Sequence, residues 1–195
     1  MDYSELTRAF GAFFAIMNPF VNLPIFLALT ADFSVAQQRA LAFKVAVYSA
    51  TMCAIVLFFG QNIIGFFGIT VDQFRIAGGV VLTNIAWSML NGREIASHHG
   101  TDNEKEQMAD LSALAFYPIT FPMIVGPGTI ATLIIYAGHA NGIKGLVAVG
   151  GVVGITLAIL FAVLFFASFF GKVLTDTMRV IMTRLMGMIL LAIAV

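Results

Sequence analysis

The stretch AFGAFFAIMNPFVNLPIFLAL, residues 9–29, decides the fold of this chain. It carries no charged side chain, and its length matches the about 20 residues that an α-helix needs to cross a bilayer. Asn18 and Pro19 interrupt it near the middle, where a proline removes one backbone donor and displaces the carbonyl one turn earlier. The stretch therefore predicts a membrane-spanning helix that is broken at membrane depth.

The composition of the whole chain agrees with a lipid environment. Hydrophobic residues make up 60% of the 195 positions and charged residues 10%, against roughly 45–50% and about 25% in soluble domains. A soluble fold of this length still exposes about a third of its unfolded surface, so it could not hide so much apolar area. The formal net charge is zero, so we expect the lipid bilayer, and no nucleic acid, as partner.

Apolar stretches of spanning length follow one another along the chain. We expect an all-α membrane protein with about six transmembrane helices, near residues 9–29, 41–67, 74–90, 111–137, 145–170 and 178–195. Bulky residues continue through the first stretch, so we expect an uncleaved span and no signal peptide. The last stretch stops at Val195, so the sixth span is expected to be minimal or shortened.

The two halves of the chain resemble each other. Four residues recur at a nearly constant offset, and the pairs are Arg75 and Arg184, Gly78 and Gly187, Leu82 and Leu191, and Pro19 and Pro127. Three spans in each half would make the copies cross the membrane in opposite directions, as in many secondary transporters. We expect residues 1–91 to form the first three-helix repeat, 92–110 a polar cytoplasmic loop, and 111–195 the second repeat.

The basic residues predict the orientation. Of the ten Lys and Arg residues, three would lie on the side of the N-terminus and seven on the other side. Cytoplasmic loops carry the excess of positive charge. Both termini are therefore predicted to face outward.

All five prolines fall within two segments, residues 17–24 and 117–129. These segments belong to the first and fourth predicted spans, which hold equivalent places in the two halves. A carbonyl freed in hydrocarbon costs several kcal/mol unless protein, water or a ligand satisfies it. Proline kinks also occur purely for helix packing, but equivalent breaks in two halves favour a binding site near the bilayer midplane.

The predicted substrate-binding residues surround these two breaks. A half-helix N-terminus can hold a carboxylate, and freed carbonyls can hold an ammonium group or a cation, so a small zwitterionic substrate fits. The predicted central site consists of Asn18, Pro19, Gly126, Pro127, Gly128 and Thr129, with Asn22, Asn84 and Thr132 around it. No cofactor is expected. Coupling to H⁺ or Na⁺ would rest on backbone, amide and hydroxyl oxygens, because no predicted span contains an internal carboxylate.

Other chemistry finds little support in the sequence. It contains no nucleophile elbow, phosphate loop or pair of catalytic carboxylates, so we do not expect an enzyme. His98 and His99 lie in the polar loop without the i, i+4 spacing of a helical ligand pair, so no metal site is expected. Cys53 lies within an apolar run and is interpreted as a packing residue.

Several motifs together resemble the MarC family of membrane proteins. They are Asn18-Pro19 through Pro24, Phe74-Arg75-Ile76-Ala77-Gly78-Gly79, Pro122 with Gly126-Pro127-Gly128, and Arg184 with Met186-Gly187. The resemblance covers essentially the whole chain and implies a six-helix protein of the bacterial inner membrane. The family is grouped with small neutral amino-acid transporters and placed near the lysine-exporter superfamily, which implies glycine, alanine or similar substrates. Val21 departs from the pattern, since members often carry glycine there, and members usually continue beyond the sixth span.

Three functions follow as hypotheses. The preferred one is a secondary transporter of small neutral amino acids that works by alternating access of two inverted repeats. The first alternative is an exporter of another small metabolite or toxic compound. The second is a non-transporting membrane scaffold or modulator, which predicts a packed, dry centre between the first and fourth spans. A homo-oligomer is compatible with each of them.

Overall fold

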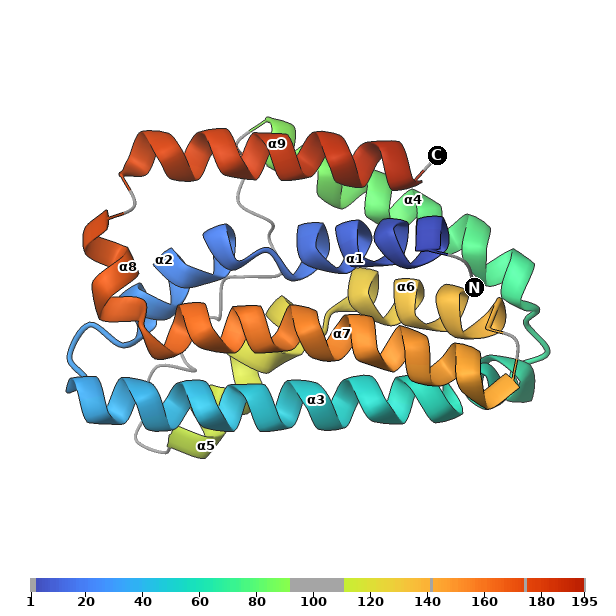
Figure 1. Cartoon of the computed structure of the whole chain (residues 1–195), viewed down its shortest axis with the longest axis horizontal. Helices are drawn as coiled ribbons and strands as arrows, with labels where there is room; N and C mark the ends of the chain where they lie inside the picture. The colour runs from blue at the N-terminus through green and yellow to red at the C-terminus, as the bar shows by residue number, and fades with distance from the viewer. Residues whose placement is uncertain (1–2, 92–110, 141, 174, 195) are drawn as a thin grey trace.

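The computed structural model describes residues 3–91, 111–140, 142–173 and 175–194. For Arg75, Lys172, Asp176, Arg179 and Ile193 it describes the backbone only. Within these residues all regular structure is helical and no strand occurs (Figure 1). This confirms the predicted all-α class, whereas the polar loop predicted at 92–110 lies outside the described residues.

The helices follow the order of the predicted spans. In chain order they are α1 (Tyr3–Met17), α2 (Pro19–Leu29), α3 (Val35–Phe66), α4 (Val71–Leu90), α5 (Leu111–Leu114), η3 (Ala115–Ile124), α6 (Pro127–Gly138), α7 (Gly142–Phe165), α8 (Ala167–Val173) and α9 (Asp176–Ala194). Together α1 and α2 occupy the first predicted span, and α5, η3 and α6 occupy the fourth.

Both α3 and α4 begin earlier than their apolar stretches predict. Ser34 and Gln37 form a capping box at the start of α3, and Thr70 and Gln73 form one at the start of α4. In a capping box the two side chains satisfy backbone donors that have no partner within the helix. Each helix therefore starts at its cap, before the first residues of the apolar stretch.

Three helical segments are long and apolar enough to cross a membrane, namely Tyr3–Leu29, Val35–Phe66 and Gly142–Phe165. The pair Leu111–Ile124 and Pro127–Gly138, bent by 61°, provides a fourth if it counts as one span. Helices α4 and α9 stand at the third and sixth predicted positions. Over their described residues they are not among the segments that are long and apolar enough to cross a membrane. The fold is thus that of an integral membrane protein with several spanning helices.

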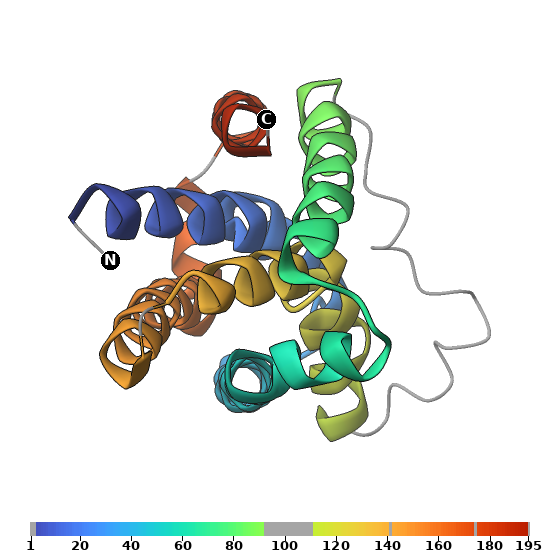
Figure 2. The same cartoon turned by 90° about the vertical axis from the view of Figure 1, so that its right-hand side faces the viewer.

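Helix α6 and the α1–α2 segment lie largely inside the bundle. Viewed along the long axis, α6 occupies the middle of the molecule (Figure 2), and it packs against α1, α3, α4 and α7. Of an 18-residue apolar stretch within the α1–α2 segment, 50% is buried inside the protein, whereas the corresponding share is 33% in α3 and in α7. The first predicted span and α6 of the fourth therefore lie toward the centre, beside the long helices α3 and α7, whereas Tyr117 and Phe121 of η3 are 41% and 37% exposed.

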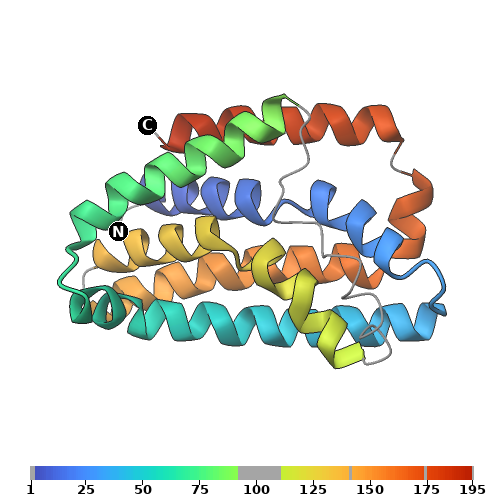
Figure 3. The ribbon, with the colours of Figure 1, turned by 180° about the vertical axis from the view of Figure 1, so that it is seen from behind.

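Helices in corresponding places of the two halves run in opposite directions. From the end of the molecule where α1 begins, α1 and α2 run away, whereas η3 and α6 run toward that end (Figures 1 and 3). Helices α3 and α7 pack against each other and run antiparallel, as do α4 and α9. Helix α9 ends at the same end of the molecule at which α1 begins.

Candidate functional site

The first break lies at Asn18, between α1 and α2, where the backbone leaves helical geometry. The Asn18 Oδ1 accepts a hydrogen bond from the backbone N–H of Phe20 at 3.0 Å, which is how asparagine caps a helix N-terminus. Pro19 holds the first position of α2, where a missing N–H removes no helical hydrogen bond. The first break is therefore a capped helix start within an apolar span.

Asn22, in the first turn of α2, donates hydrogen bonds to backbone carbonyls at the first break. Its Nδ2 donates to the carbonyl oxygens of Met17 at 2.7 Å and of Asn18 at 3.1 Å. The carbonyl of Met17 lies at the end of α1, where carbonyls have no helical partner, whereas the carbonyl of Asn18 also accepts from the backbone N–H groups of Val21 and Asn22. The Oδ1 of Asn22 and the Nδ2 of Asn18 have no partner in the described structure, although the two residues are only 4% and 2% exposed. The first break thus leaves one donor and one acceptor unpaired in the interior.

The second break lies at residues 125–126, between η3 and α6. Tyr117 and Phe121 have extended backbone conformations within η3, because a following proline disfavours the helical region for the residue before it. The chain then turns by 61° into α6. A Cβ on Gly126 would overlap the carbonyl oxygen of Pro122, so this turn requires glycine.

The start of α6 carries no side-chain cap. Gly126 occupies the capping position, and no side-chain hydrogen bond reaches the first turn. The hydroxyl of Thr129 donates to the carbonyl of Ile124 at 2.7 Å, and that of Thr132 donates to the carbonyl of Gly128 at 2.9 Å. First-turn N–H groups have no helical partner and lie at the positive end of the helix dipole. The α6 start can therefore hold an anionic group, in contrast to α2, which Asn18 caps.

The two breaks lie next to each other. Helix α1 packs against α6, and a Cβ built on Gly128 would lie 3.5 Å from the Cγ2 atom of Ile16, two residues before Asn18. Opposite views of the fold show both breaks at the same level, near the middle of the long axis (Figures 1 and 3). The first and second breaks therefore belong to one buried region.

Most of the predicted site residues lie in this region. The buried ones are Asn18, Pro19, Asn22, Gly126, Gly128, Thr129 and Thr132. The side chain of Pro127 is exposed, and Pro127 occupies the first position of α6.

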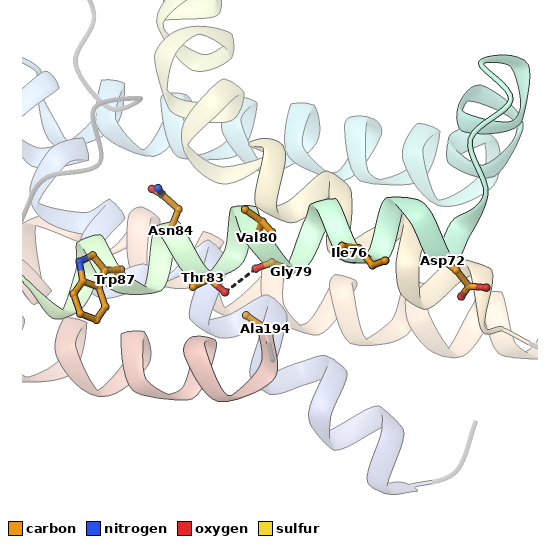
Figure 4. Close-up of a pocket in the computed structure, with 8 residues that line it drawn as sticks. All are labelled: Asp72, Ile76, Gly79, Val80, Thr83, Asn84, Trp87 and Ala194. Atoms are coloured by element: carbon orange, nitrogen blue, oxygen red, sulfur yellow. Dashed lines mark hydrogen bonds between the residues drawn. The ribbon is translucent and has the colours of Figure 1, made fainter.

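Asn84 is separated from this group. Leu82 and Ile85 are the α4 residues nearest to Gly128, and the intervening Asn84 projects from another side of the helix, about 100° from Ile85. The Asn84 side chain is exposed and lines a groove of about 750 Å³ between α4 and the end of α9, together with Trp87 (Figure 4). The structure thus places Asn84 on the outer surface and not beside the breaks.

Two further buried polar residues, on η3 and on the α3 helix that packs against it, are not among the predicted site residues. Thr120 is fully buried in η3, and its hydroxyl lies 3.5 Å from the carbonyl oxygen of Val45 on α3. Ser49, also on α3, is 1% exposed, and its hydroxyl has no partner in the described structure. The position of Thr120 between two prolines could have indicated a site residue from the sequence. Ser49 gives no such indication, because a serine within an apolar helix ordinarily donates to a carbonyl of its own preceding turn.

Comparison with known proteins shows which family the chain belongs to. The family described as "MarC family integral membrane protein" matches residues 3–195. The "UPF0056 membrane protein YvbG" of Bacillus subtilis is 38% identical, over 100% of this chain and 92% of that protein. The "UPF0056 membrane protein YhcE" of Escherichia coli is 27% identical, over 100% of this chain and 90% of that protein. No solved structure matches the chain.

Proposed function

The chain belongs to the MarC family of integral membrane proteins, and we propose that it is a secondary transporter of small neutral amino acids such as glycine and alanine. Two buried side-chain atoms carry this proposal: the Asn18 Nδ2 and the Asn22 Oδ1 have no partner in the described structure. They lie beside a second helix break whose helix start has no side-chain cap. An unsatisfied buried polar group costs about 1–3 kcal/mol. A region that keeps both a donor and an acceptor unpaired is suited to a ligand that satisfies them.

An amino-acid zwitterion matches the groups at the two breaks. Its carboxylate would accept hydrogen bonds from the Asn18 Nδ2 and from the first-turn N–H groups of α6, and its ammonium group would donate to the Asn22 Oδ1. No charged residue occurs in 17–24 or in 115–132. A zwitterion carries its own compensating charges, so it can bind at the two breaks without a charged side chain from these segments.

The close packing around α6 favours a small substrate. A Cβ on Gly128 would come within 2.9 Å of the Ile85 Cδ1 atom and 3.3 Å of the Leu82 Cδ2 atom. Little space thus remains for a side chain of the substrate on this side. An exporter of apolar compounds would be expected to offer an apolar cavity, whereas the unpaired groups at the first break are amides.

Alternating access by two inverted three-helix repeats is part of the same proposal. It is supported by the opposite directions of α1–α2 and η3–α6, of α3 and α7, and of α4 and α9. Six spans would then consist of these pairs, with the central site between the repeats. The excess of Lys and Arg on one side of the predicted spans supports an orientation with both termini outside, and the family resemblance supports placement in the bacterial inner membrane.

Counterflow in proteoliposomes tests this function without knowledge of the coupling ion. Vesicles loaded with unlabelled alanine are diluted into buffer with a trace of labelled glycine, alanine or leucine. We expect labelled glycine and alanine to accumulate transiently, and leucine to accumulate less. The Asn18→Ser protein, which lacks the unpaired donor, serves as the matched low-flux variant. If monodisperse protein gave no counterflow of any zwitterion above that of protein-free vesicles, the transporter assignment would be wrong.

A further inference from the structure

A second group of buried oxygen atoms lies where η3 packs against α3. The Thr120 Oγ1 is 3.5 Å from the carbonyl oxygen of Val45. In an α-helix this carbonyl points toward the N–H of the residue four positions later, which is Ser49. Val45 and Ser49 also share one buried face of α3. The hydroxyls of Thr120 and Ser49 therefore belong to the same contact between the two helices.

These two hydroxyls are poorly satisfied compared with others in the bundle. Thr132 and Thr156 each donate to the carbonyl one turn earlier in their own helix, at 2.9 and 3.0 Å, as hydroxyls in helices commonly do. Ser49 makes no such bond within the described structure. The 3.5 Å separation at Thr120 is longer than an ordinary hydroxyl hydrogen bond. Oxygen lone pairs therefore remain available at this contact.

The backbone of η3 adds more acceptors than donors. Pro118 and Pro122 supply carbonyls but no N–H groups, and the extended residues Tyr117 and Phe121 interrupt the helical ladder. The acidic ligands that calcium and magnesium usually require do not occur in this segment. Backbone carbonyls of interrupted membrane helices coordinate sodium in secondary transporters, and neutral carbonyl oxygens can replace the hydration shell of a monovalent cation without a carboxylate. Hydroxyl oxygens are neutral acceptors as well.

We propose that the α3–η3 contact binds a monovalent cation of the size of sodium, through the Ser49 and Thr120 hydroxyl oxygens and carbonyl oxygens of η3. The backbone N–H of Val125, at the second break, donates to the carbonyl of Thr120 at 2.8 Å. A cation at Thr120 is thus one hydrogen bond away from the start of α6, which carries the proposed carboxylate site. Its role as coupling ion rests on the proposed transport function, whereas its binding does not.

Ion-specific stabilisation of the purified protein tests the cation site. The full chain in detergent is melted in sodium, potassium or choline chloride at equal ionic strength, without any amino acid. At about ten times its dissociation constant an ion multiplies the ratio of folded to unfolded protein roughly elevenfold. For a chain of this size this corresponds to a rise in Tm of roughly 3–6 °C, which we expect in sodium relative to choline.

The variants locate the effect. Ser49→Ala and Thr120→Val should each reduce the sodium shift to less than about 1 °C, whereas Thr120→Ser retains the oxygen and should retain the shift. Thr156→Val, which removes a buried hydroxyl on α7 that already has a partner, is the matched control and should also retain it. If Thr120→Val does not yield monodisperse protein, Ser49→Ala and Thr120→Ser decide.

Two outcomes would overturn the cation site. Equal Tm values in sodium and choline would mean that Ser49 is satisfied by water rather than by an ion. An undiminished sodium shift in Ser49→Ala would place any bound ion elsewhere. Because the melts contain no amino acid, a normal sodium shift without alanine counterflow would refute the transport function alone, and the reverse result would refute only the cation site.

Discussion

Replacing Asn18 with serine separates the capping role of this residue from its proposed binding role. Serine accepts a hydrogen bond from the first turn of a helix about as well as asparagine does, so the cap on Phe20 is expected to persist. The substitution removes the Nδ2, which is the unpaired buried donor. We therefore expect the free energy of unfolding to change by less than about 0.5 kcal/mol, and Tm by less than about 2 °C.

The same substitution should strongly weaken the binding of alanine. A hydrogen bond to a charged partner contributes about 1.5–3 kcal/mol, so loss of the bond from Nδ2 to the substrate carboxylate should raise the dissociation constant roughly 10- to 150-fold. Isothermal titration calorimetry of alanine into the purified protein measures this change directly.

Asn18→Ala provides the comparison that isolates the cap. Alanine lacks both the capping oxygen and the donor, so this protein should lose binding and also about 1 kcal/mol of stability. Wild-type affinity for alanine in a folded Asn18→Ser protein would refute the reasoning, because it would show that the Nδ2 does not contact the substrate.

Three further substitutions test the placement of the site. Gly126→Ala should cost about 1–3 kcal/mol, because its Cβ would overlap the Pro122 carbonyl oxygen, whereas Gly151→Ala, with nothing within 4 Å of the added atom, should be neutral or stabilising in chemical unfolding. Asn22→Leu should lower the free energy of unfolding by about 1–3 kcal/mol, because the Met17 carbonyl at the end of α1 loses its side-chain donor; a change below about 0.5 kcal/mol would argue against that function of the amide. Asn84→Ala should leave the dissociation constant for alanine unchanged within about twofold, and a tenfold loss would mean that the groove beside α4 takes part in binding.

The helix breaks could be predicted from the sequence because their causes are local. Asn18 before Pro19 is a capping residue followed by a residue suited to the first helical position, and the prolines of η3 force the residues before them out of helical geometry. These effects need no information about neighbouring helices. The structure accordingly shows both breaks where the prolines indicated them.

The side on which each polar residue lies could not be predicted in the same way. Asn84 belongs to an apolar helix like the buried asparagines, but the rotation of α4 follows from the contact of Leu82 and Ile85 with Gly128. That contact joins residues far apart in the chain. The Ser49 hydroxyl is unpaired within the described structure. It lies one helical turn after Val45, whose contact with Thr120 joins residues 75 positions apart, so Ser49 could be recognised only from the tertiary arrangement.

The starts of α3 and α4 were missed for a different reason. Their capping boxes are visible in the sequence as Ser34 and Gln37 and as Thr70 and Gln73. The predicted spans followed the apolar residues alone, and a helix can begin in polar residues outside the hydrocarbon when its first donors are capped. Capping signals therefore improve the bounds of membrane helices as well as those of soluble ones.

A crystal structure of the protein with bound alanine tests most directly whether the two breaks share one ligand site. We predict electron density for the amino acid between the Asn18 Nδ2, the Asn22 Oδ1 and the first turn of α6. Crystals grown without alanine should show no such density. Alanine bound elsewhere, with both asparagine groups still unpaired, would contradict a shared site. So would a centre closely packed by side chains in both crystals.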